Sequence, residues 1–104
     1  MKEKCIESLS TALTSASRWR AGLDNKWPDH RNQKAAKQLD KLAAEAANLS
    51  EAQWTALAPF FGSERWGEAL RRTSRMVGFA RRRVSLVYFV RQLAGLLSEP
   101  ATAA

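Results

Sequence analysis

Apolar residues recur at intervals of three and four along most of this chain of 104 residues. Because an α-helix completes a turn every 3.6 residues, this spacing places them on one face of successive helices. Only five Gly and three Pro interrupt the pattern, and 45% of the residues are hydrophobic, enough to fill one core. The sequence therefore predicts an all-α fold, a compact bundle of four to five helices. We expect a single domain over residues 1–98 and a frayed tail over 99–104.

The first helix is predicted from about Lys2 to Ala21, with Gly22 as its C-terminal stop. The connector that follows, over residues 23–29, contains Trp27-Pro28, and a residue before proline avoids the helical conformation. On a helical wheel the helix has one apolar stripe, which we expect to be buried. The stripe consists of Cys5, Leu9, Ala12, Leu13, Ala16 and Trp19.

The second helix is predicted from Asp29 or His30 to about Asn48, with Lys34, Lys37 and Lys41 on the face opposite its apolar residues. We interpret that lysine face as a solvated surface. The tetrapeptide Ser50-Glu51-Ala52-Gln53 is a capping box, which predicts that a new helix begins at Glu51. Pro59 then predicts the end of that helix near Ala58.

The last helical region begins at Ser63 and carries two apolar stripes that cannot face the same partner. The first stripe runs from Trp66 to Val84 and the second from Leu86 to Leu97, rotated by about 130° on a common wheel. One interpretation is a break near Gly78. The other is a single long helix that changes its packing partner halfway along.

Positive charge is concentrated in the C-terminal part of a chain whose net charge is +7. Residues 1–62 carry nine Lys or Arg against seven acids, whereas residues 63–104 carry eight Arg against three Glu. Seven arginines lie between Glu68 and Glu99 with no acid among them: Arg71, Arg72, Arg75, Arg81, Arg82, Arg83 and Arg91. Arginine binds phosphate and carboxylate groups in a bidentate manner and stacks on planar groups.

The first functional hypothesis is binding of nucleic acid, with RNA or single-stranded DNA favoured. On one helix from Ser63 to Ser85, Arg71, Arg75 and Arg82 would share a face that could follow a phosphate backbone. Phe79 beside that face could stack on an unpaired base. The predicted binding set is Arg71, Arg72, Arg75, Arg81, Arg82, Arg83 and Phe79, in a small subunit of a larger nucleoprotein complex.

Two other functional hypotheses remain open. A further alternative is that the arginine face is only solvated and binds no partner. In a helix-turn-helix regulator, Gly78-Phe79 would form the turn and Val84 and Val87 the two buried positions of a recognition helix. The apolar run from Val84 to Val90 fits a DNA-facing helix poorly. In a protein-interaction module, an inhibitor or assembly factor, the arginines would instead dock on an acidic protein surface.

The segment from Val84 to Leu97 holds more apolar residues than one packing face requires. It therefore predicts contact with a protein partner, or self-association, through the C-terminal helix. The residues predicted for this interface are Leu86, Tyr88, Phe89 and Arg91.

The sequence lacks the combinations of residues that most catalytic sites require. Cys5 and His30 are the single cysteine and histidine, so a nucleophile with its base, or a zinc site, lacks residues. No glycine-rich phosphate loop occurs, and we predict a protein without enzymatic activity, metal or cofactor. A lone cysteine, and no signal-peptide pattern or apolar run of about 20 residues, predict a cytoplasmic protein that does not enter the membrane.

Overall fold

The computed structural model describes residues 2–26, 30–77 and 83–99. Within these ranges the backbone forms five α-helices and no strand: α1 (Lys2–Lys26), α2 (His30–Glu45), α3 (Glu51–Leu57), α4 (Glu64–Val77) and α5 (Leu86–Ser98). Short 3₁₀ helices, Ala46–Asn48 and Ala58–Phe60, follow α2 and α3. The predicted all-α bundle is confirmed. Trp27, Gly78, Phe79, Arg81, Arg82 and residues 100–104 lie outside the described ranges.

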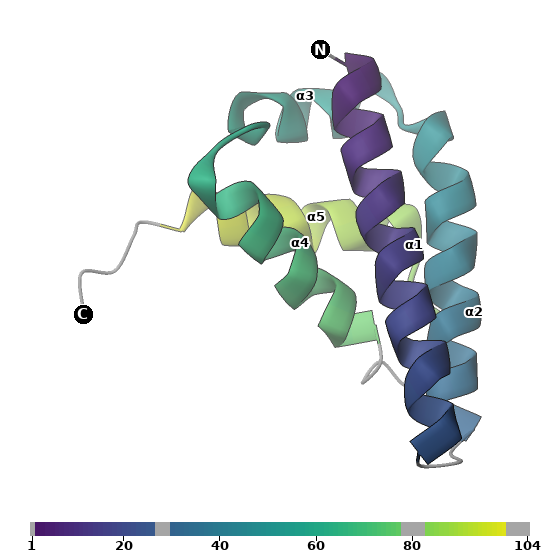
Figure 1. Cartoon of the computed structure of the whole chain (residues 1–104). Coiled ribbons are helices and arrows are strands. Elements are labelled where there is room, and N and C mark those ends of the chain that lie inside the picture. The colour runs from purple at the N-terminus through teal and green to yellow at the C-terminus, as the bar shows by residue number, and fades with distance from the viewer. Residues whose placement is uncertain (1, 27–29, 78–82, 100–104) are drawn as a thin grey trace.

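Helices α1 and α2 form an antiparallel pair (Figure 1). Two serines of α1 tie the helices together: Ser10 Oγ donates to the carbonyl of Ala43 at 3.2 Å, and Ser17 Oγ donates to that of Ala36 at 3.0 Å. The residue number on α2 falls as the residue number on α1 rises, as expected for antiparallel helices. Figure 1 shows α4 to one side of this pair, α5 crossing behind α1, and α3 across the end where α1 begins.

The first helix does not stop where the sequence predicted. It continues through Gly22 to Lys26, so the predicted end at Ala21 and the predicted connector over 23–26 are wrong. A glycine ends a helix by adopting a positive φ, and among the described residues only Gly62 does so. Gly22 therefore stays helical.

The buried stripe of α1 also differs from the prediction at its C-terminal end. Cys5, Leu9 and Leu13 are buried as expected, but the stripe continues to Ser17, and the Trp19 side chain is 52% exposed. The physical reason is that the residues buried against α2 recur at intervals of four, and Trp19 lies to one side of that line. The prediction of a buried Trp19 is wrong.

The predicted capping box at the start of α3 is confirmed. Gln53 N–H donates to Ser50 Oγ at 3.2 Å, and Ser50 N–H donates to Gln53 Oε1 at 2.8 Å. The helix ends at Leu57, just before Pro59, as expected. At the start of α1, Lys2 Nζ lies 2.8 Å from Glu51 Oε1 and joins α1 to α3.

Replacing Ser50 with alanine should lower the free energy of unfolding by about 1 kcal/mol, because the Gln53 N–H loses its acceptor. Urea denaturation would measure the loss. Ser98→Ala is a suitable control, since Ser98 Oγ donates to the Ala94 carbonyl within a helix and caps no N-terminus. An equal loss in both variants would contradict a specific role for the cap.

The open question of a break near Gly78 is settled in favour of two helices. Helix α4 ends at Val77, and α5 begins at Leu86. Ser85 is the N-cap of α5, and its Oγ accepts a hydrogen bond from Tyr88 N–H at 3.2 Å. The two apolar stripes thus belong to two helices, and each faces the core by itself.

The core lies where α5 meets the other helices. Phe89, Leu93 and Leu97 of α5 are buried together with Leu9 and Leu39 of the α1–α2 pair. Helix α5 also packs against α3 and α4. None of the helices in the described part of the chain combines the length and apolarity that crossing a membrane requires.

Candidate functional site

The structure divides the predicted arginine set between two places. Arg71, Arg72 and Arg75 are exposed on α4, and Arg83 is exposed in the segment before α5. Phe79, Arg81 and Arg82 of the same predicted set lie outside the described residues.

The single helical face predicted for Arg71, Arg75 and Arg82 does not form. That face required one helix over residues 63–85, whereas α4 ends at Val77 and residues 83–85 are not helical. Arg71 and Arg75, one turn apart, do share a face of α4, and Arg72 is rotated from Arg71 by about 100°. The arginine face on α4 is therefore shorter than the sequence predicted.

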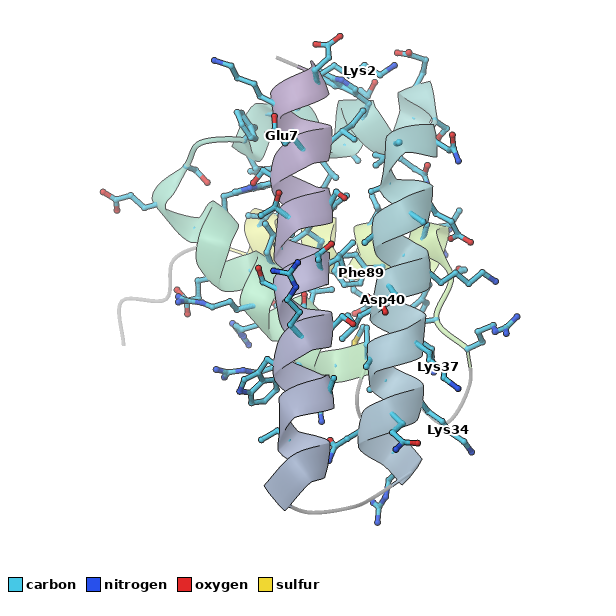
Figure 2. The ribbon with its side chains drawn as sticks, turned by 45° about the vertical axis from the view of Figure 1, so that its right-hand side comes forward. Lys2, Glu7, Lys34, Lys37, Asp40 and Phe89 are labelled. Atoms are coloured by element: carbon cyan, nitrogen blue, oxygen red, sulfur yellow. The ribbon has the colours of Figure 1, made fainter. Side chains whose placement is uncertain are left out.

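Arg83 is held next to α2. The backbone N–H of Val84 donates to Gln38 Oε1 at 2.9 Å, which fixes this segment to the middle of α2. Lys34 and Lys37 are exposed on the same stretch of α2 and point away from the bundle (Figure 2). Arg83, the neighbour of Val84 in the chain, is thus kept beside α2, the helix that carries the lysine face.

Arg71 and Arg75 border a groove between α1 and α4. The groove has a volume of about 720 Å³. Its base consists of the buried side chains of Leu39, Trp66 and Leu70, and Ala12 and Ala16 of α1 also line it. We call this feature the α1–α4 groove.

Hydrogen bonds join the two walls of the α1–α4 groove near both of its ends. Trp66 Nε1 donates to Ser8 Oγ at 2.9 Å, and Arg20 Nη2 donates to the backbone carbonyl of Arg75 at 3.2 Å. These two bonds hold α1 and α4 at a set separation. The groove is therefore formed before any ligand arrives, which reduces the ordering that binding would require.

Arg20 also supports the exposed Trp19. Its guanidinium carbon lies 5.2 Å from the centroid of the Trp19 ring, and its Nη1 donates to Asn32 Oδ1 at 3.3 Å. Partial burial lowers the pKa of the Arg20 guanidinium from its ordinary value, but arginine side chains are not deprotonated in proteins near neutral pH. A fixed cation thus backs an exposed indole that lines the groove.

The lining of the α1–α4 groove is strongly cationic. It contains four cations, Lys4, Arg20, Arg71 and Arg75, against one carboxylate, that of Glu7. In the described part of the chain, the side chains of Lys4, Arg71 and Arg75 form no ion pair or hydrogen bond. Three positive charges are therefore available to an anionic ligand.

Gly67 leaves open space in the groove wall. A Cβ atom at this position would meet no heavy atom within 4 Å, and the residue lines the groove from α4. The walls also carry small hydroxyl side chains, Thr11 and Ser15 of α1 among them. The groove is consequently wide enough at this point to accept a larger side chain or a ligand.

The residues of the predicted partner interface are partly buried in the core and partly exposed. Leu86 and Phe89 are buried in the core of this chain, whereas Tyr88 and Arg91 are exposed. Only the latter two are available to a partner, because the α5 face that carries Leu86 and Phe89 packs inward. Val87 is 54% exposed and not a buried position of a recognition helix, so the helix-turn-helix alignment loses that support.

Cys5 is not placed as a nucleophile. It is buried, and burial raises the pKa of its thiol above the ordinary value, which disfavours the reactive thiolate. Among the described residues, no three His, Cys, Asp or Glu side chains come together as metal ligands.

Sequence reasoning missed Trp19 and Lys4 as groove residues. The available signal was that Trp19 stands between Arg18 and Arg20, an arrangement unusual for a core residue.

Comparison with protein-family models, with curated proteins and with solved structures found no match. Any function assigned to the groove must therefore follow from the chemistry of its own residues.

Proposed function

We propose that the protein binds RNA or single-stranded DNA without strong sequence preference and without catalysing a reaction. The observation that carries the proposal is that Arg71 and Arg75 line one preformed groove together with Lys4 and the exposed Trp19. Arginine and lysine contact phosphates through charge, which does not depend on base sequence.

The number of phosphates contacted sets the expected salt dependence of this binding. Three phosphate contacts on a single strand give a slope of log K against log salt concentration of roughly −2. Affinity should then fall by about 20-fold between roughly 50 and 200 mM salt. This dependence is shallower than expected for the full predicted set of arginines, because only part of that set lines the groove.

The double variant Arg71→Ala, Arg75→Ala should bind single strands on the order of tenfold more weakly at low salt, and its salt slope should be reduced by about two thirds. Fluorescence anisotropy with a labelled oligonucleotide, repeated across salt concentrations, measures both quantities. Both residues are exposed, so we expect the variant to fold normally.

Lys34→Ala, Lys37→Ala is the matched control. It removes the same two positive charges from an exposed helical face outside the groove. Equal losses in the two double variants would mean that net charge governs binding and would reject the groove as the site. Absence of binding to any nucleic acid at low salt would reject the function itself.

A second candidate function is docking of an acidic protein segment in the same groove. The observation in its favour is the apolar base formed by Leu39, Trp66 and Leu70, which could accept the apolar face of a helix. The exposed Val87, Tyr88 and Arg91 of α5 would also suit a subunit of a larger assembly. We favour nucleic acid because the exposed indole and the free guanidinium groups occur together.

A further inference from the structure

We infer that the α1–α4 groove is a base-stacking site, in which the indole of Trp19 stacks on an unpaired base and thereby makes the protein prefer single strands to duplexes. This inference rests on the proposed function, and it adds the residue and the contact that decide which form of nucleic acid is bound.

The exposure of Trp19 is the first observation. Among the described tryptophans, Trp66 is 6% exposed and Trp54 is partly buried, whereas Trp19 is 52% exposed. An indole left in water gains from any planar apolar surface that covers it. A nucleobase offers such a surface whatever its sequence, which agrees with sequence-tolerant binding.

The support of Trp19 is the second observation. The Arg20 guanidinium lies over the ring and is itself anchored to Asn32 on α2 and to the Arg75 carbonyl on α4. Bonds to two other helices thus hold the Arg20 guanidinium, and that guanidinium in turn lies against the indole. A base that stacks on it does not have to order a mobile side chain, so more of the stacking energy contributes to affinity.

Charge complementarity is the third observation. The anchor between Arg20 and the Arg75 carbonyl brings the C-terminal turn of α4 to the Trp19 end of the groove, where the exposed guanidinium of Arg75 also lies. Arg71 stands one turn earlier on the same wall. A strand with a base on Trp19 would therefore have cations available for the phosphates that follow.

The length of the groove suits a short single strand. The lining residues of α1 extend from Lys4 to Arg20, and the distance from Lys4 to Trp19 along the helix is about 22 Å. At roughly 3.4 Å for each stacked nucleotide, this length accommodates about six nucleotides. Inside a duplex the bases are already paired and stacked, so an interior base cannot cover Trp19 unless it is first extruded.

The first experiment compares Trp19→Ala with the wild-type chain on an unstructured RNA of about 12 nucleotides and on the corresponding blunt duplex. We expect the variant to bind the single strand on the order of tenfold more weakly and the duplex unchanged, because base stacking on an aromatic residue changes affinity by roughly 5- to 150-fold. The affinity of Trp19→Phe for the single strand should lie between those of the wild type and of Trp19→Ala, because phenylalanine keeps a smaller aromatic ring.

A second pair of variants tests the groove without touching charge or the indole. Gly67→Leu places a side chain into the open space of the groove, and Gly95→Leu places the same side chain on α5, outside the groove. Both glycines are helical and have no atom near the added Cβ, so both variants should fold. We expect only Gly67→Leu to weaken binding of the single strand.

The outcomes separate this inference from the proposed function. If wild type binds both nucleic acids, and Trp19→Ala binds the single strand as tightly as wild type does, the stacking inference is overturned while the proposed function stands. If neither nucleic acid binds, both fail. Tight binding of a helical probe peptide with Glu on one face and Leu on the other, blocked by Gly67→Leu, would then reassign the groove to an acidic protein segment.

Discussion

Replacing Phe89 with alanine is expected to lower the free energy of unfolding by about 3–5 kcal/mol. The Phe89 side chain has no exposed surface and belongs to the core cluster of α5 (Figure 2). Truncation removes the apolar contacts of a whole ring and leaves a cavity that the surrounding helices can fill only in part. Urea denaturation followed by far-ultraviolet circular dichroism would measure the loss.

Tyr88→Ala is the control for Phe89→Ala. Tyr88 is the neighbouring residue on α5 but is 46% exposed, so its truncation should change stability by about 0.5 kcal/mol or less. Phe89→Leu provides a milder change in case the alanine variant does not fold. If Phe89→Ala kept its stability and only lost self-association, Phe89 would be an interface residue, as the sequence alone suggested.

Replacing Arg65 with methionine is expected to lower the free energy of unfolding by about 2 kcal/mol, the range for hydrogen bonds that involve a charged group. Arg65 Nη2 donates to the carbonyl of Leu96 at 2.6 Å, and its Nη1 donates to that of Leu97 at 3.3 Å and to that of Glu99. These carbonyls lie at the C-terminal end of α5, where helical acceptors lack partners and a cation is favourable. Thermal unfolding would measure the effect.

The control for Arg65→Met is Arg72→Met, on the same helix. Arg72 is exposed and forms no hydrogen bond or ion pair in the described part of the chain, so its loss should change stability by about 0.5 kcal/mol or less. Arg65→Lys should recover part of the stability, because it keeps the charge but not the planar fork that reaches several carbonyls. Equal losses for Arg65→Met and Arg72→Met would show that Arg65 contributes only general positive charge.

Local signals in the sequence correctly predicted most of the helical architecture. The capping box at Ser50 and the stop near Pro59 placed α3, because both act through bonds within a few residues. The two incompatible apolar stripes after Ser63 indicated a possible break near Gly78, and the structure has two helices there. Gly22 misled the prediction, since a glycine ends a helix only if the chain adopts a positive φ at that point.

The candidate site was predictable only in part. The sequence placed Arg71, Arg72 and Arg75 among the cations predicted to meet a ligand, and all three are exposed. It did not show that Arg83 lies against α2, where Gln38 holds the backbone of Val84. It placed Trp19 in the core and Leu86 and Phe89 at a partner interface, and burial reverses all three assignments.

The sequence by itself determined the helices of this protein and its cationic character, because helix periodicity, caps and charge are properties of residues close together in the chain. Only the tertiary structure decided that α1 and α4 leave a groove between them with Trp19, Arg71 and Arg75 along it. The reason is that this geometry depends on contacts between distant residues. Trp66 bonds to Ser8 and Arg20 to the Arg75 carbonyl, across 58 and 55 positions of the chain, and no local pattern encodes such pairs.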